Sequence, residues 1–162
     1  MKKMVAIVLL STLILMEGCA TSYQPKGLTG GFADRQISED TFTITFQGNG
    51  FTSQDRSNEL ALVRAADVTI EHGFSYFEGL DMKAGMNTSY LEHPGSASTY
   101  GHFSGKSYYS STVYNPPTVT AINRPETAIM IKCYVNDPGP PHKTFDARKI
   151  KEAGAKKYGL AN

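Results

Sequence analysis

The stretch that decides the fold is Thr41-Phe42-Thr43-Ile44-Thr45-Phe46-Gln47. Its aromatic and aliphatic residues alternate with threonines, which is the period-two pattern of a strand with one buried face. Gly48-Asn49-Gly50 follows and interrupts that pattern. We therefore predict a strand over residues 41–47 that ends in a tight turn.

A helix is predicted directly after this turn. Thr52 offers a side-chain oxygen as N-cap, and Asp55 stands three residues further on, as in a capping box. The apolar stripe of the helix is formed by Leu62, Val63, Ala66 and Ile70. Gly73 is placed to end the helix as a C-cap, and the chain then resumes as a strand over residues 74–80.

The last third of the chain adds a core strand and a C-terminal helix. Residues 128–135 alternate in polarity and place on one face Ile129, Ile131, Cys133 and Val135. Further on, Asp146 is placed to cap a short helix that runs to about Lys157, with Gly159 beyond it. The predicted fold class is α+β: a small single domain with strand-helix-strand, a long Tyr/Ser/Gly-rich segment, a further core strand and this helix.

The long segment, residues 82–124, is predicted to be a loop or hairpin insertion. A structureless loop of this length is uncommon in a compact domain, and residues 108–114 form a candidate strand or hairpin arm. Tyrosines among Ser and Gly are typical of adaptable binding surfaces, although an ordinary exposed hairpin has the same composition. The candidate partner-binding residues are Tyr100, Tyr108, Tyr109 and Tyr114.

Residues 1–18 are predicted to be a lipoprotein signal peptide. Lys2 and Lys3 precede an apolar run that is too short to span a bilayer comfortably. The run ends in Met16-Glu17-Gly18-Cys19, which resembles a lipobox: an apolar residue, a small residue next to the cysteine, and the thiol that takes the lipid. Glu17 stands where a small neutral residue is expected. The alternative is a conventional secretory signal, for which the sequence offers no good Ala-x-Ala site.

Composition limits the function of the mature chain. Removal of residues 1–18 takes away two of the 16 lysines and arginines and one of the 15 acidic residues, so 14 of each remain. A neutral chain is not expected to bind nucleic acid, whose phosphates need a positive face. Of the two cysteines the lipid would take Cys19, which leaves Cys133 without an intramolecular disulfide partner.

The domain organisation follows from these patterns. Residues 19–40 are rich in turn formers and are predicted to be the lipidated N-terminus and an extended tether. Residues 41–160 are predicted to form the single globular domain.

Several segments carry a resemblance to known proteins: Cys19-Ala-Thr-Ser-Tyr-Gln-Pro25, Thr29-Gly-Gly31, Gly48-Asn-Gly-Phe-Thr-Ser53, Leu62-Val-Arg-Ala-Ala66 and Ala128-Ile-Met-Ile-Lys132. They resemble a family of small, functionally uncharacterised proteobacterial lipoproteins. The resemblance implies a lipid anchor at Cys19 and no activity or binding residues. Ala20 stands where Asp would indicate inner-membrane retention, so resemblance to Gram-negative lipoproteins implies the outer membrane.

Three further features of the sequence are typical of functional sites, and simpler structural interpretations are weighed against them. Gly48-Asn49-Gly50 before a helix superficially matches a dinucleotide-binding turn, whereas glycines also permit a tight strand-to-helix turn. Cys133 is a nucleophile candidate, but its place on the apolar face favours a core thiol. His93 and His102 are weak candidates for zinc ligands.

The sequence thus favours a non-enzymatic binding or structural module without cofactor or catalytic residues. Its expected partners are the membrane, through the lipid on Cys19, and an envelope protein or cell-wall polymer. The alternative is a small periplasmic hydrolase or metal-dependent enzyme that uses the loop histidines.

Overall fold

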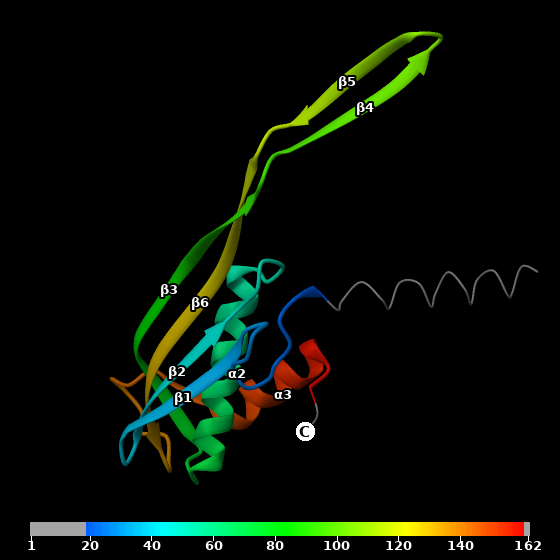
Figure 1. Cartoon of the computed structure of the whole chain (residues 1–162). Coiled ribbons are helices and arrows are strands. Elements are labelled where there is room, and N and C mark those ends of the chain that lie inside the picture. The colour runs from blue at the N-terminus through cyan, green and yellow to red at the C-terminus, as the bar shows by residue number, and fades with distance from the viewer. Residues whose placement is uncertain (1–18, 161–162) are drawn as a thin grey trace, which may run out of the picture. The chain divides into compact units, whose positions relative to one another are not determined.

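The computed structural model describes residues 19–160 (Figure 1). The predicted signal peptide, residues 1–18, lies outside the described residues. The strands of the described chain are β1 Gly31–Ser38, β2 Thr41–Gln47, β3 Tyr76–His93, β4 Ser96–Ser104, β5 Ser107–Asn115, β6 Thr118–Tyr134 and β7 Thr144–Asp146. Its helices are α2 Gln54–Glu71 and α3 Ala147–Tyr158. The fold is therefore mixed α+β, as predicted, with more sheet than helix.

The chain divides into two compact units. The first, here called the body, comprises the described residues up to Asn87 and from Asn123 onward. The second, here called the hairpin unit, is residues 88–122. The chain enters the hairpin unit within β3 and leaves it within β6.

The sheet of the body has the strand order β1-β2-β6-β3-β7. β2 pairs antiparallel with β6, so that Phe42 lies opposite Ile131 and Ile44 opposite Ile129. Directly opposed residues of an antiparallel pair share a face. The register thus gathers the apolar residues of both strands on one side of the sheet, as the alternation over residues 41–47 predicts.

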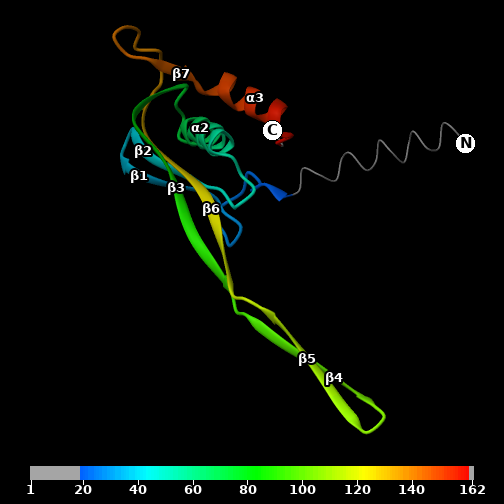
Figure 2. The ribbon, with the colours of Figure 1, turned by 90° about the horizontal axis from the view of Figure 1, so that it is seen from above.

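Helix α2 covers this apolar face (Figure 2). Phe46, Phe77 and Leu60 are completely buried in the core between them. Ala61 and Ala65 are also completely buried, and their small side chains let the helix lie close to the sheet. The predicted strand and helix are both confirmed, and together they make the core.

The boundaries of α2 differ from the prediction at its start. Ser53, not Thr52, is the N-cap, and its side chain accepts the backbone N–H of Arg56. The hydroxyl of Thr52 is instead directed to the N-terminal segment, as described below. At the other end Gly73 follows the C-cap with φ +82°, a conformation that glycine adopts without strain.

The C-terminal part contains one confirmed helix and two differences. Asp146 caps α3 by accepting the N–H of Lys149, and Gly159 ends it in the left-handed region, both as predicted. Val135 does not share the buried face, because β6 ends at Tyr134 and the Val135 side chain is 59% exposed. The short edge strand β7 was not predicted, since three residues are too few to show a period.

The N-terminal segment is not the tether that its turn-forming composition predicts. Gly31–Ser38 form β1, which pairs with β2 at the edge of the sheet. Before it, the Tyr23 ring lies 4.8 Å from the Phe32 ring, and its hydroxyl donates to Asp67 on α2. Burial and this hydrogen bond raise the pKa of Tyr23. The segment just after Cys19 is therefore already part of the fold.

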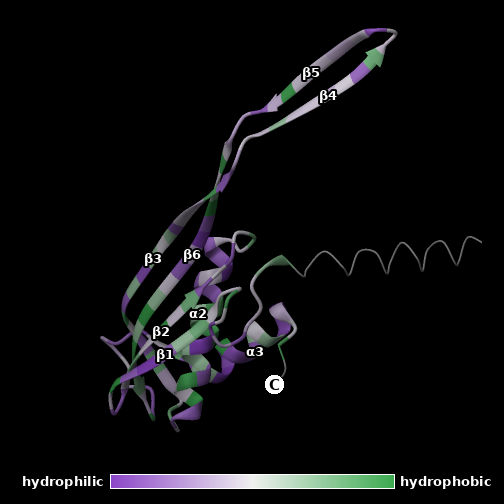
Figure 3. Ribbon diagram, viewed as in Figure 1, coloured by the Kyte–Doolittle hydropathy of each residue, from purple (hydrophilic) through white to green (hydrophobic). Residues whose placement is uncertain are grey.

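The hairpin unit is built differently. β4 and β5 form a two-stranded antiparallel sheet, joined by a turn in which Gly105 has φ +63°. No residue in the range 88–122 is buried. Figure 3 shows hydrophobic colour on α2 and the strands beneath it, whereas β4 and β5 carry mixed and mostly pale colours. The prediction of a hairpin insertion is confirmed for this segment.

Candidate functional site

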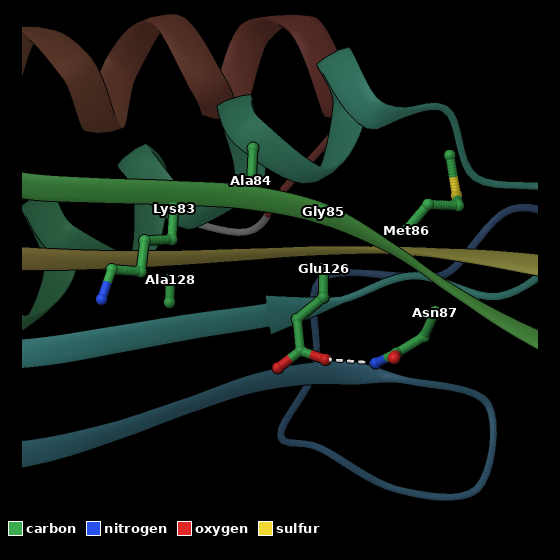
Figure 4. A pocket seen from close by; sticks show the side chains of 7 residues that line it. All are labelled: Lys83, Ala84, Gly85, Met86, Asn87, Glu126 and Ala128. Atoms are coloured by element: carbon green, nitrogen blue, oxygen red, sulfur yellow. Dashed lines mark hydrogen bonds between the residues drawn. The ribbon is translucent and has the colours of Figure 1, made fainter.

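One hollow on the body lies beside the strands that continue into the hairpin unit. It has a volume of about 280 Å³, lies between β3 and β6 and is lined by Lys83, Met86, Asn87 and Glu126 among others (Figure 4). The Asn87 amide already donates to the Glu126 carboxylate at 2.8 Å. The hollow contains no hydroxyl or thiol nucleophile beside a base, so its side chains have no evident chemistry to perform.

Two other features concern function. The first is the place where the predicted lipidation site meets the body, here called the anchor seat and defined as Cys19, Thr21, Thr29, Asn49 and Thr52. The second is the aromatic surface of the hairpin unit.

The anchor seat is a network of hydrogen bonds around Thr21, which is only 2% exposed. The Thr21 N–H donates to the Thr52 hydroxyl at 2.9 Å, and the Thr21 hydroxyl donates to the Thr29 carbonyl oxygen at 2.9 Å. The Asn49 backbone N–H donates to the Thr21 hydroxyl at 2.8 Å, and its side-chain amide donates to the Cys19 carbonyl oxygen at 2.8 Å. The turn between β2 and α2 therefore holds the chain directly at Cys19.

Cys19 itself is exposed, and its thiol is free. A lipid attached to this sulfur would leave the body in place, because the seat uses only the backbone of Cys19. One residue, Ala20, separates it from the buried Thr21. Cys19 is thus held at the folded body and is not separated from it by a flexible linker.

The same hydrogen bonds argue against a dinucleotide at the Gly48-Asn49-Gly50 turn. A phosphate would need free backbone N–H groups at the start of α2. The N–H groups of Asn49, Phe51 and Arg56 are instead used by side chains of the protein. Gly48 has a packing role, since a Cβ there would lie 2.6 Å from the Thr52 Cβ. The structural interpretation of the turn is confirmed.

Cys133 is a core thiol, as its alternation predicts. It is 2% exposed, and its Sγ lies 3.5 Å from the Thr69 hydroxyl. Burial raises the pKa of the thiol, which lowers the population of the reactive thiolate. The structure gives this group no access to a substrate.

His93 and His102, the weak candidates for zinc ligands, are not joined by other metal-binding side chains in the described part of the chain. Among residues 19–160 no three or more His, Cys, Asp or Glu side chains are grouped so as to hold a metal ion. The His102 ring instead stacks on Tyr109 at 5.6 Å. His93 lies at the end of β3.

The structure distributes the four predicted partner-binding tyrosines over both faces of the hairpin. Tyr114 and Tyr108 share one face, on which Tyr108 lies opposite Phe103 with ring centroids 5.0 Å apart. Tyr100 and Tyr109 share the other face. Their exposed fractions lie between 55% and 67%. The unit thus presents aromatic rings on each side without burying any of them.

Comparison with known proteins found no relatives. No family model matches the chain, and neither a curated protein nor a solved structure is significantly similar to it. Within the described residues, no helix is both long and apolar enough to cross a membrane. The function must therefore be inferred from the anchor seat and the hairpin unit themselves.

The sequence alone does not reveal the role of Thr21, Asn49 and Thr52. These polar residues lie far apart along the chain, and their hydroxyl and amide groups appear in the sequence only as turn or capping signals. The one available signal was the Gly-Asn-Gly-Phe-Thr-Ser segment together with the segment that begins at Cys19, which were both part of the family resemblance.

Proposed function

We propose that the protein is a lipoprotein of the bacterial outer membrane that uses its hairpin unit to bind another envelope protein. The observation that carries this proposal is the exposure of the hairpin aromatics: Tyr90 70%, Tyr100 67%, Phe103 77%, Tyr108 58%, Tyr109 55% and Tyr114 66%. A group of large, exposed aromatic side chains on one small unit is typical of an interaction site.

The energetics of the hairpin support a binding role. An isolated two-stranded hairpin is marginally stable in water, because it has no hydrophobic core. Cross-strand contacts such as the Thr99–Thr112 hydroxyl pair at 2.9 Å add only about 0.2–1 kcal/mol each. A partner that covers the rings would supply the burial that the unit lacks.

A protein partner fits this surface better than a charged polymer. Within the described chain β4 and β5 pair only with each other, so each has an outer edge with free backbone groups. An extended polypeptide can add to such an edge, and the tyrosines beside it then contact its side chains. The hairpin unit contains one acidic residue, Glu92, and one lysine, Lys106, so it offers little charge to a polyanion.

Two features support the lipid anchor. Cys19 is exposed and free at the point where the described chain begins, next to the lipobox-like Met16-Glu17-Gly18. The seat holds its backbone without using its thiol. Intact mass and membrane fractionation of wild-type protein beside Cys19→Ser test this part: the wild type should carry diacylglycerol and a further acyl chain and sediment with outer membrane.

Photo-crosslinking in living cells tests the binding role. Benzoylphenylalanine in place of Tyr108 probes one face of the hairpin, and in place of Tyr109 it probes the other. The same group in place of Val135 is the control on the body. We expect one discrete protein adduct from the hairpin positions and none from Val135.

The adduct should also disappear when tyrosines near the crosslinker are replaced by serine, as in Tyr100→Ser with the crosslinker at Tyr109. Absence of any adduct at both hairpin positions would contradict the proposal. Sedimentation of the protein with purified cell wall in place of an adduct would indicate a polymer partner instead.

A further inference from the structure

Two large apolar side chains, each adjacent in sequence to a residue of the anchor seat, are exposed to solvent. Leu28 is 105% exposed and Phe51 is 75% exposed. Leu28 precedes Thr29, whose carbonyl oxygen accepts the Thr21 hydroxyl at 2.9 Å. Phe51 stands two residues after Asn49, which bonds to the Cys19 carbonyl oxygen. Both side chains therefore sit on turns that are bonded to the seat itself.

The backbone of each turn is fixed. Gly27 and Gly30, which flank Leu28, exchange backbone hydrogen bonds of 3.0 and 3.2 Å. The Phe51 N–H donates to the Asn49 side chain at 3.0 Å, and the next N–H donates to the Asn49 carbonyl oxygen at 3.1 Å. Neither apolar side chain can reach the core without breaking these bonds. Their exposure is thus a stable property of the two turns.

The reach of the lipid anchor is short. One residue spans at most about 3.6 Å, so the path from Cys19 to the buried Thr21 covers no more than about 7 Å. The interfacial region on each side of a bilayer is about 5–8 Å deep. A lipid on Cys19 would therefore hold Thr21, to which both turns are hydrogen-bonded, close to the headgroups.

We propose that Leu28 and Phe51 insert into the bilayer interface beside the acylated Cys19. The membrane then contacts this end of the body at three points, the lipid and the two turns, which restricts how the body tilts on the bilayer. Lys26, exposed next to the first turn, supplies a cation for anionic headgroups. This proposal rests on the lipid anchor of the proposed function and adds the surface that meets the membrane.

Single exposed apolar residues are common on proteins and need no explanation. The case here depends on two of them standing on turns that are hydrogen-bonded to the segment that begins at Cys19, the one position where a lipid would be attached. The occupant of this surface is therefore taken to be the bilayer and not a second copy of the chain.

Tryptophan fluorescence tests the proposal, because the chain has no tryptophan of its own. The variants are L28W and F51W, with V135W as a matched exposed control. Val135 follows Tyr134, whose carbonyl oxygen accepts the Ser75 N–H just beyond the C-terminal end of α2. The 18 residues of α2 span about 27 Å, so this control lies far from the anchor seat.

Each lipidated full-length mature protein is reconstituted in phosphatidylethanolamine and phosphatidylglycerol vesicles, with and without brominated acyl chains. We expect blue-shifted emission and at least twofold quenching by bromine in L28W and F51W, and neither effect in V135W. Unquenched emission at either turn overturns the proposal. A blue shift without bromine quenching also overturns it, since another protein copy would then cover the side chain.

Intact mass and flotation of the same samples separate this test from that of the anchor. Protein that lacks acyl chains and does not float contradicts the proposed lipoprotein function and the membrane contact with it. Protein that is acylated and floats, yet shows no quenching, contradicts the membrane contact alone.

Discussion

The body and the hairpin unit both contain aromatic residues, eleven among the 107 described residues of the body and six among the 35 of the hairpin unit, but they use them in opposite ways. Phe42, Phe46 and Phe77 are at most 1% exposed, whereas Phe103 in the hairpin is 77% exposed. In the body the aromatic rings fill the space between α2 and the sheet. In the hairpin unit they have no covering layer. The aromatic residues of the body thus stabilise its core, whereas those of the hairpin unit are exposed, which is the feature on which the proposed binding role rests.

Matched substitutions in the two regions measure this contrast, and the largest effect is expected in the core. Phe77→Ala should lower the free energy of unfolding by about 3–5 kcal/mol, because it removes a fully buried ring and leaves a cavity. Phe103→Ala should change it by less than about 0.5 kcal/mol. Both free energies of unfolding are measured by urea denaturation followed by circular dichroism. The protein used begins at residue 19 and carries Cys19→Ser. Equal losses would show that the hairpin belongs to the core.

A second pair compares threonine hydroxyls. Thr21→Val removes a buried hydroxyl that donates to the Thr29 carbonyl oxygen and accepts from the Asn49 N–H and the Thr52 hydroxyl, so we expect a loss of about 1–3 kcal/mol. Thr99→Val removes the exposed bond to Thr112 and should cost under about 0.5 kcal/mol. The same urea measurement applies. A Thr21→Val protein as stable as wild type would mean that the anchor seat is not a rigid part of the body.

A third pair compares glycines. A Cβ at Gly154 on α3 would lie 2.3 Å from a methyl group of Val63, so Gly154→Ala should destabilise the protein by about 1–3 kcal/mol. The double variant with Val63→Ala should be less destabilised than the two single changes added together. Gly101→Ala meets only the exposed Tyr108 ring, which can move aside, and should have little effect. Thermal unfolding distinguishes these outcomes. If the losses in stability from Gly154→Ala and Val63→Ala simply add in the double variant, the close contact between α2 and α3 at these residues is refuted.

The smallest expected effect concerns pH. Lys157 donates to the Glu59 carboxylate at 2.8 Å, and this bond, together with one from Tyr158, holds the pKa of Glu59 below its usual value. A lowered folded-state pKa stabilises the fold at pH values above the unfolded pKa of about 4.3, and the contribution fades as pH falls through the folded value.

The stability difference between wild type and Glu59→Gln should therefore be constant near neutral pH and shrink in acid. Urea titrations between pH 7 and pH 3 measure it, with Glu92→Gln in the hairpin unit as control. A difference that grows in acid would contradict the assignment of Glu59 as the stabilising carboxylate.

The parts of the fold that could be predicted are those with a periodic pattern. The strand over residues 41–47 and α2 have one buried face each, so polarity alternates or repeats along them. The extensions of β3 and β6 into the hairpin unit have no buried face, so no period marks them. The segment before β1 was misassigned because its order comes from hydrogen bonds to Asn49 and Thr52, which composition does not record.

For the candidate site too, local sequence patterns could be read, whereas contacts between distant residues could not. Cys19 and the tyrosines could be proposed as site residues because each belongs to a local motif or to a segment of distinctive composition. The seat that holds Cys19 was not found, since it forms only when residues about thirty positions apart meet.

The most direct test of the difference between the regions is hydrogen–deuterium exchange of the lipidated protein in two settings. One is a pure reconstituted vesicle and the other is native outer-membrane vesicles. Amides of α2 should exchange slowly in both, whereas amides of residues 88–122 should exchange fast in the pure vesicle and become protected in the native membrane, where a partner covers them. Fast exchange of the hairpin in both settings would contradict its role as the binding surface.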